Sequence, residues 1–253
     1  MTANSFALSR AFNGYGETGA QTVAVGGQSL SAWNLVFDNT GRITSKTETV
    51  NGVAVSYSYT YDPVGRLLTV TKDGTLVEEY RYNANGSRTY EMNAQRGIAG
   101  RNLAYSDEDH LLTAGDASYQ YDTDGFLTTR TVGSDVTTYD YSSKGELYSV
   151  GLPDSTFIEY VHDPLGRRIA KKVDGAVVEK YLWAGMTQLL AVYDGSGALK
   201  MRFEYADSRT PYAMTQGGAV YYLTFDQVGS LREFRGHHTE LGAVQKSIIL
   251  LME

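Results

Sequence analysis

One short stretch decides the fold: Tyr61-Asp62-Pro63-Val64-Gly65-Arg66-Leu67. Variants of it recur along the chain roughly every 16 to 32 residues, most often near 20. A fixed unit at such a period indicates a repeat architecture, in which each unit buries its apolar face against its neighbours. The residues expected to build the repeat turns are Asp38, Gly41, Tyr61, Asp62, Gly65, Tyr82, Gly86, Tyr121, Asp122, Gly125, Tyr141, Gly145, Asp163, Gly166, Tyr193, Asp194, Gly197, Asp226 and Gly229.

Each part of the unit has a local physical role. The aromatic residue, here Tyr61, ends a strand. The side chain of Asp62 can accept hydrogen bonds from backbone N–H groups two residues further on. Gly65 can adopt a positive φ without a Cβ penalty. The unit is therefore predicted to be a turn.

The segments between these turns have the pattern of half-buried strands. Val55, Tyr57 and Tyr59 share one parity, and the polar residues between them share the other. Downstream, Asp73-Gly74 favours a tight hairpin turn, so one repeat consists of two strands and two turns. The chain is therefore predicted to be all-β and built of consecutive antiparallel hairpins. Further second turns are expected at Gly26-Gly27, Asn51-Gly52, Gly115-Asp116, Gly133-Ser134, Pro153-Asp154, Asp174-Gly175 and Gly217-Gly218.

The repeat predicts one continuous β domain over residues 1–253. Residues 1–36 are expected to form an atypical N-terminal capping hairpin, residues 37–231 the repeats, and residues 232–253 a degenerate, truncated last repeat. The pattern loosens over residues 93–101, where we expect a longer loop. Asp109 stands where Gly is expected, and a turn is still predicted because Asp tolerates the left-handed region.

A segment near the N-terminus imitates a cofactor motif. Gly14-Tyr15-Gly16-Glu17-Thr18-Gly19 fits the G-x-G-x-x-G pattern of dinucleotide-binding proteins, and Asp38 follows about 20 residues later. That motif requires a strand before it and a helix after it. Because a strand and a turn follow instead, we predict no cofactor site here.

Composition narrows the functional classes. The chain has 253 residues, a formal net charge of −7 and a pI of about 5.2, so a nucleic acid backbone would repel it. It contains no cysteine, which excludes disulfides and thiolate chemistry. No run of about 18 apolar residues predicts a membrane span. Residues 1–10 lack the basic and apolar regions of a signal peptide. We therefore predict neither nucleic-acid binding nor a membrane span.

The repeated aromatic-Asp-x-x-Gly unit resembles the YD repeat of the RHS/YD-repeat family, which includes bacterial Rhs, wall-associated, toxin-complex and teneurin-like proteins. The resemblance covers roughly residues 37–231. It implies a β-sheet that spirals into a hollow shell, which in full-length relatives encloses a variable C-terminal toxin released by autoproteolysis. With about eighteen expected strands, this chain would form an open fragment of such a shell.

The resemblance transfers no catalytic residue. The family's core segment after the repeats, which carries the self-cleavage site, has no counterpart here. The run Asp163-Pro164-Leu165-Gly166-Arg167 is a repeat turn rather than that segment. A payload is also missing from the sequence, so its identity stays open.

The sequence predicts no catalytic, cofactor or metal site. Asp107-Glu108-Asp109 is the densest carboxylate group, but nearly every Asp already has a turn role. His110 and His162 occupy repeat positions, which favours packing, and His237-His238 would point to opposite faces of a strand. Without a nucleophile motif, we expect no enzyme.

Two functional hypotheses remain. The first is a structural, non-enzymatic shell module whose full-length relatives encapsulate and deliver a toxin or act at the cell surface, and are secreted or surface-located. The second is a cell-surface carbohydrate-binding module that uses exposed Tyr rows, such as Tyr119 and Tyr121. The expected partners are accordingly a toxin payload or the remainder of a larger RHS protein, cell-surface glycans, and other copies of the chain at unpaired sheet edges. Solvent-facing Tyr rows would favour the second hypothesis and packed Tyr rows the first.

Overall fold

The computed structural model describes residues 6–206 and 210–236 and shows an all-β chain. It contains 22 strands and one short 3-10 helix, η1 (Ala94–Arg96). Consecutive strands pair antiparallel in hairpins. This confirms the predicted fold class, with more strands than the expected number. No helix in the described part of the chain is long and apolar enough to cross a membrane.

The chain divides into two compact units, which we call the terminal and the central unit. The terminal unit comprises Met1–Gly65, Thr71–Thr75 and Met201–Glu253, and the central unit Arg66–Val70 and Leu76–Lys200. A single domain over residues 1–253 therefore stays a prediction.

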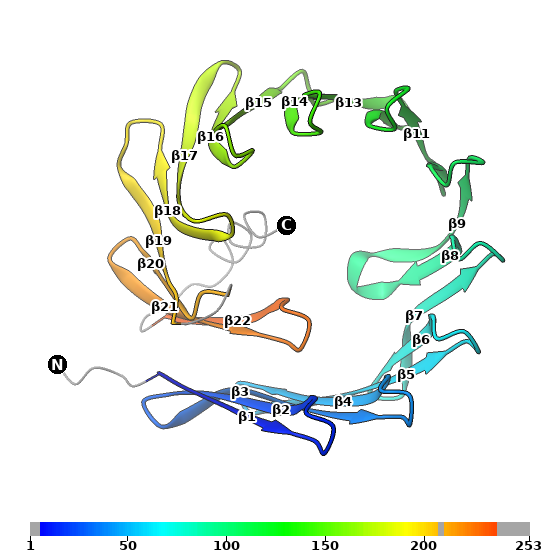
Figure 1. Ribbon diagram of the computed structural model, residues 1–253, viewed down its shortest axis with the longest axis vertical. Coiled ribbons are helices and arrows are strands. Elements are labelled where there is room, and N and C mark those ends of the chain that lie inside the picture. The colour runs from blue at the N-terminus through cyan, green and yellow to red at the C-terminus, as the bar shows by residue number, and fades with distance from the viewer. Residues whose placement is uncertain (1–5, 207–209, 237–253) are drawn as a thin grey trace. The chain divides into compact units, whose positions relative to one another are not determined.

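The terminal unit contains two series of antiparallel strands. In the first, each strand from β1 to β5 pairs with the next, and in the second, each strand from β19 to β22 does so. Figure 1 shows the first series in blue and the second in orange. The strands are β1 (Phe6–Phe12), β2 (Thr18–Val25), β3 (Gln28–Phe37), β4 (Ile43–Val50), β5 (Val53–Tyr61), β19 (Leu199–Glu204, from Met201 onward), β20 (Ala213–Gln216), β21 (Ala219–Phe225) and β22 (Leu231–Gly236).

The central unit is a run of hairpins from β7 to β18, preceded by most of β6. The predicted loop over residues 93–101 is wrong, because η1 closes a tight hairpin there and the next strand begins at Ile98. The strands are β6 (Leu67–Lys72), β7 (Thr75–Tyr82), β8 (Arg88–Asn93), β9 (Ile98–Tyr105), β10 (Leu111–Ala114), β11 (Ala117–Tyr121), β12 (Leu127–Val132), β13 (Asp135–Tyr141), β14 (Leu147–Gly151), β15 (Phe157–His162), β16 (Arg168–Val173), β17 (Ala176–Ala184) and β18 (Gln188–Asp194).

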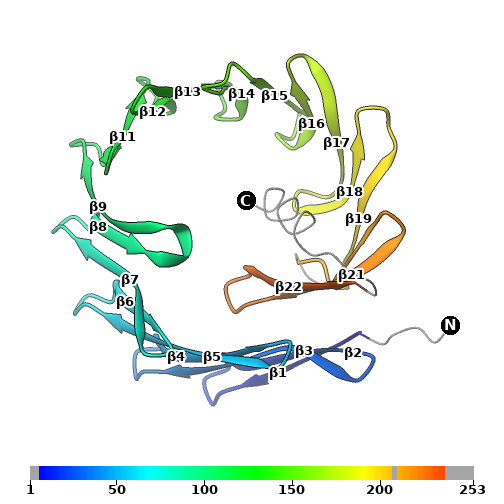
Figure 2. The same ribbon diagram turned by 180° about the vertical axis from the view of Figure 1, so that it is seen from behind.

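Within the terminal unit, the second series of strands covers one face of the first. β22 lies against β3, as Figures 1 and 2 both show. Because the strand faces alternate, this packing buries Val23 and Trp33 from the first series and Leu223 from the second. In the central unit between residues 115 and 190, only Ala117, Thr137 and Val150 are buried.

Candidate functional site: stacked turns and a buried charge cluster

The turn at residues 37–42 shows why the repeat needs Asp and Gly. The Asp38 N–H donates to the Arg42 carbonyl (2.9 Å) and the Gly41 N–H to the Asp38 carbonyl (3.1 Å). Asp38 Oδ1 accepts the N–H groups of Thr40 (2.9 Å) and Arg42 (3.0 Å), and Oδ2 accepts Arg42 Nε (2.7 Å). Gly41 has a φ of 79°. The Asp side chain thus binds the N–H groups that the turn leaves unpaired.

The same pair of backbone hydrogen bonds closes turns throughout both units. Where Asn or Ser stands in place of Asp, its side-chain oxygen makes the same contact. Ser142 Oγ, for example, accepts the N–H groups of Lys144 and Glu146.

The structure places the predicted Asp and Gly residues in turns, each directly after an aromatic residue. In the turn at Asp62, the Gly65 N–H donates to the Asp62 carbonyl (3.0 Å) and the Val64 N–H to Asp62 Oδ1 (3.0 Å). The aromatic residue ends its strand except at Tyr193, where β18 continues to Asp194. Backbone-closed turns lie at residues 13–17, 38–42, 83–87, 106–110, 122–126, 142–146, 152–156, 163–167, 194–198 and 226–230.

Two of these turns were misread in the sequence, and the third, at Asp109, was predicted correctly. The G-x-G-x-x-G segment belongs to a repeat turn, in which Asn13 Oδ1 accepts the N–H groups of Tyr15 and Glu17. Its signal, Phe12-Asn13-x-x-Gly16, was present in the sequence. The turn at Pro153-Asp154 is of this five-residue type rather than a second turn, with Ser155 in the Gly position at a φ of 70°. At residues 106–110, Ser106 takes the Asp role and Asp109 adopts a φ of 63°.

In several turns the residue after the turn Gly contacts the following turn. The Arg42 guanidinium lies 5.1 Å from the ring centroid of Tyr61, and the Tyr61 hydroxyl donates back to the Ile43 carbonyl (2.7 Å). Arg66 repeats the contact with Tyr82 at 4.7 Å, and Tyr82 donates to the Leu67 carbonyl (2.9 Å). The turns that follow Tyr61 and Tyr82 are therefore each clamped to the preceding turn by a ring contact and a hydrogen bond.

Aromatic residues make this contact at two of the turns without Arg. His110 stacks on Tyr121 with ring centroids 4.7 Å apart, and Phe126 on Tyr141 at 5.2 Å. A Cβ added at Gly145 would lie 3.0 Å from Phe126 Cε1. Gly is thus required both for its φ and for the neighbour that lies over it. The position after Gly carries no single residue type, which is why the sequence did not reveal it.

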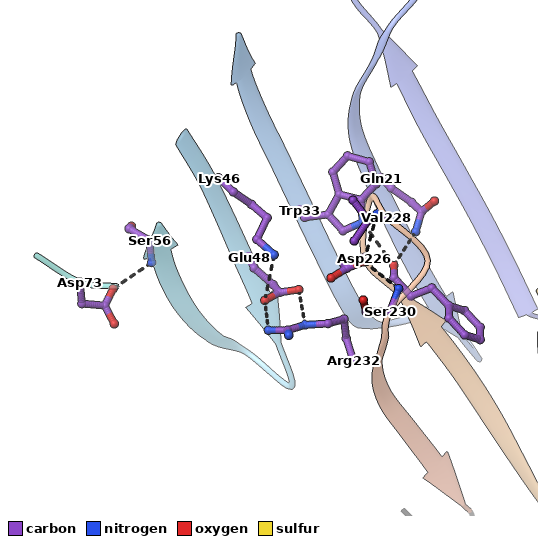
Figure 3. Close-up of polar contacts among 11 residues, drawn as sticks. Gln21, Trp33, Lys46, Glu48, Ser56, Asp73, Asp226, Val228, Ser230 and Arg232 are labelled. Atoms are coloured by element: carbon purple, nitrogen blue, oxygen red, sulfur yellow. Dashed lines mark hydrogen bonds and ion pairs between the residues drawn. The ribbon is translucent and has the colours of Figure 1, made fainter. Parts of the chain in front are cut away.

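A cluster of buried charges lies in the terminal unit between the two series of strands. Glu48, on β4, is 3% exposed and accepts two hydrogen bonds from Arg232, on β22, one of them from Nε at 2.8 Å. Lys46 Nζ lies 3.6 Å from Glu48 Oε2 and 4.8 Å from the ring centroid of Tyr57. Figure 3 shows Glu48 between Lys46 and Arg232.

The electrostatics of the cluster follow from its burial. Burial lowers the pKa of Lys46, against the opposing effect of Glu48. The pKa of Arg232 is raised because the hydrogen bonds and charge of Glu48 outweigh its own burial. Burial also raises the pKa of the nearby Tyr59 hydroxyl. The arrangement holds one carboxylate between two cations, which suits it to joining two strand series.

Two backbone contacts complete this junction. The Phe225 carbonyl, at the end of β21, accepts the Trp33 indole N–H (3.4 Å) and the Gln21 side-chain N–H (3.3 Å). Figure 3 shows both side chains reaching the turn that carries Asp226. We call this set of contacts, with the charge cluster, the seam.

The candidate histidines and acidic residues that the structure describes lie in turns and strands. Asp107, Glu108 and Asp109 are exposed in one turn. The pKa of His162 is lowered, first by burial and then by Arg168. His237 and His238 lie outside the described residues. Among the residues that the structure describes, no group of three or more His, Asp or Glu side chains could hold a metal ion.

The Tyr rows named as possible glycan platforms are packed. Tyr57 and Tyr80 are buried, and the other members are half-buried. The Tyr121 hydroxyl donates to the Leu111 carbonyl (3.0 Å) and the Trp183 indole to the Arg168 carbonyl (2.7 Å). These rings therefore serve turn-to-turn packing. The half-buried members are Tyr59, Tyr61, Tyr82, Tyr119, Tyr121, Tyr139, Tyr141, Tyr181 and Trp183.

Comparisons with known proteins agree with this architecture. The family model described as the teneurin YD-shell matches residues 1–248. Teneurin-3 of Mus musculus is 29% identical over 211 residues, which cover 80% of this chain and 8% of that protein. Double-stranded DNA deaminase toxin A of Burkholderia cenocepacia (strain H111) is 28% identical over 167 residues, or 60% of this chain and 11% of the toxin.

Solved structures give a weaker likeness. The crystal structure of TcdB2-TccC3-Cdc42 aligns with a TM-score of 0.46 and 12% identity, covering 94% of this chain and 18% of that one. The chain spans only about 8% of the length of the first teneurins that it matches.

Proposed function

Because the chain belongs to the teneurin YD-shell family, a family of structural shells, we propose that it serves as a wall segment of a shell that encloses a C-terminal toxic polypeptide. In this role the chain itself performs no chemistry. Its partner is the payload, or the remainder of a larger RHS protein, and its place of action is outside the cell or at the cell surface.

The observation that carries this proposal is the clamping of successive turns. A wall must resist local opening, because a sheet that frays would expose both its contents and its own strand edges. Here a ring contact and a hydrogen bond to the preceding turn recur in both units, as at Tyr61 and Tyr121. Such contacts stiffen each hairpin against the next without needing a conventional core.

The toxin part of the proposal draws on one relative. Double-stranded DNA deaminase toxin A carries a matching segment over 60% of this chain, and that segment is 11% of the toxin. A shared wall with a separate toxic segment would account for a match that covers only 11% of the toxin. Glycan binding by the Tyr rows is not proposed further, because those rings are packed.

Protease protection tests the enclosure. An unfolded, protease-cleavable reporter peptide is fused after Glu253, and the cleavage rate is compared with that of the same peptide fused before Met1. If the wall shields its C-terminal side, we expect the C-terminal reporter to be cut at least about ten-fold more slowly, since cleavage follows the accessible population. Equal rates for the two fusions would contradict the proposal.

A further inference from the structure

Strand β1 of the terminal unit is an unprotected sheet edge. Among the described residues it pairs with β2 alone, along its seven residues. From Ala7 to Phe12 every residue is exposed, with Leu8 at 45% and Phe12 at 62%. Natural edges are usually blocked by proline, charged side chains, a central bulge or a covering element. β1 has no proline, Arg10 is its one charged residue, and the irregularity of its pairing with β2 lies at its end, between Ala11 and Phe12.

The sequence of β1 is nearly a palindrome centred on Ser9: Phe-Ala-Leu-Ser-Arg-Ala-Phe. If two copies of the strand are laid antiparallel with Ser9 opposite Ser9, Phe6 of one copy faces Phe12 of the other. Ala7 then faces Ala11. Directly opposed side chains in an antiparallel pair lie about 4.5–5.5 Å apart at Cβ, so the two Ala7–Ala11 pairs would be in contact. The Phe6 ring keeps its packing on Tyr212 and Tyr222 of its own chain, with ring centroids 5.2 and 6.0 Å away.

The one mismatch in the palindrome favours the pairing. Leu8 faces Arg10 of the second copy, so the two guanidinium groups are not directly opposite each other and like charges are separated. Arg10 Nε is already held on its own sheet by Gln21 Oε1 at 3.0 Å. The aliphatic stem of Arg10 is therefore available to cover Leu8, while its charge keeps its existing partner.

We propose that β1 is a self-association edge through which a second copy of this chain pairs, antiparallel and centred on Ser9, so that the two sheets continue into each other. Such an interface is isologous and closes after two copies, because each β1 edge satisfies the other. It would pair the outward N–H and C=O groups of both strands, which no other strand in the described part of the chain pairs.

Site-directed cysteines test both the contact and its register, because the chain has no cysteine of its own. Ser9→Cys should form a covalent dimer on mild oxidation, since opposed residues lie within the Cα range that a disulfide spans. Ala7→Cys and Ala11→Cys should cross-link efficiently when mixed, and much less when each is oxidised alone. The matched control is Ser58→Cys, an exposed serine on β5 away from the β1 edge.

Light scattering over a concentration series completes the test. We expect the unmodified chain to become dimeric with rising concentration. Ser9→Lys places two charges opposite each other and should raise the concentration needed for dimerisation at least about ten-fold. Circular dichroism establishes that each variant is folded. A strict monomer, or a dimer whose Ser9→Cys variant cross-links no better than Ser58→Cys, would overturn the proposal.

Discussion

The terminal and central units are built from the same hairpins but bury them differently. In the terminal unit a second series of strands covers one face, so that Lys46 and Glu48 have side chains only 5% and 4% exposed. In the central unit the comparable pair of Lys172 and Glu159, also 3.6 Å apart, has side chains that are 33% and 35% exposed. The repeat therefore determines the path of the chain. The second series of strands determines how deeply a side chain is buried, and so how much it contributes to stability.

The comparison also separates two kinds of stabilisation. Turn-to-turn contacts occur in both units, as with Arg42 on Tyr61 and Phe126 on Tyr141. Buried charges that join segments distant in sequence occur at the seam, where Glu48 meets Arg232. Substitutions at the seam should thus lower the free energy of unfolding strongly. Substitutions in the turns should lower it less, and by similar amounts in the two units.

The largest effect is expected from Glu48→Ala. Removing this carboxylate leaves the buried Lys46 and the partly exposed Arg232 without a counter-charge. Breaking a buried ion pair in this way typically costs about 3–5 kcal/mol. The exposed counterpart Glu159→Ala should cost less than about 1 kcal/mol. Urea unfolding measures both free energies of unfolding.

A triple replacement sharpens this result. Changing Lys46, Glu48 and Arg232 together to Met, Leu and Met removes the charges but keeps the volume, and should recover most of the loss. If Glu48→Ala and Glu159→Ala lose equal stability, the difference between covered and uncovered charge pairs is refuted.

Leucine truncation gives the apolar version of the comparison. Leu223 is 2% exposed on β21 and Leu182 is 47% exposed on β17. We expect Leu223→Ala to lower the free energy of unfolding by about 2–5 kcal/mol, because it leaves a cavity between the two series of strands. Leu182→Ala should lower it by less than about 1 kcal/mol. Chemical denaturation measures both values, provided that the variants share the same dependence of the free energy of unfolding on denaturant concentration. Equal losses for the two variants would contradict the expectation.

Replacing a turn glycine by alanine should lower the free energy of unfolding by a similar amount in both units. Gly41 and Gly145 have φ values of 79° and 83°, and an added Cβ would lie 3.0 Å from a neighbouring side chain in each case. We expect Gly→Ala at either position to cost about 1–2 kcal/mol, measured by thermal unfolding. Gly14→Ala is the control, because nothing lies within 4 Å of its added Cβ. A loss at only one of the two turns would show that the turn is not an independent local unit.

The smallest effect is a change in acid sensitivity that the two units share. The pKa of Asp38 is lowered, chiefly by the Thr40 hydroxyl, and that of Asp163 is lowered because its hydrogen bonds from Arg167 and the turn outweigh its burial. A carboxyl with a depressed pKa in the folded state stabilises above its ordinary pKa of 3.8, and this stabilisation is lost as pH falls below that value.

Asparagine at both positions tests this linkage. Asn keeps the oxygen that accepts the turn N–H groups, as Asn13 does, but cannot titrate. The double variant Asp38→Asn/Asp163→Asn should therefore lose less stability than the unmodified chain between about pH 4 and pH 2. Urea midpoints across this range supply the measurement, and an unchanged pH slope would argue against the linkage.

Most of the local structure could be predicted from the sequence. The Asp and Gly of each turn act through hydrogen bonds within five residues and through one positive φ, so their signal is local. The alternation around Tyr57 likewise marked the half-buried strand. The type of the turn at residues 152–156 was misassigned because Leu152 has no acceptor oxygen in its side chain and Ser155 is not Gly. This turn is nevertheless closed by backbone hydrogen bonds between the paired strands β14 and β15.

The sequence by itself determined the order of the hairpins, the turn positions and the family, because each rests on interactions between near neighbours. Only the tertiary structure decided which face is covered, which residue stacks on the following turn, and that Glu48 meets Arg232 across 184 positions. Alternation shows that a strand has a buried face but not what covers it. That choice depends on segments far apart in the chain, and no local pattern encodes it.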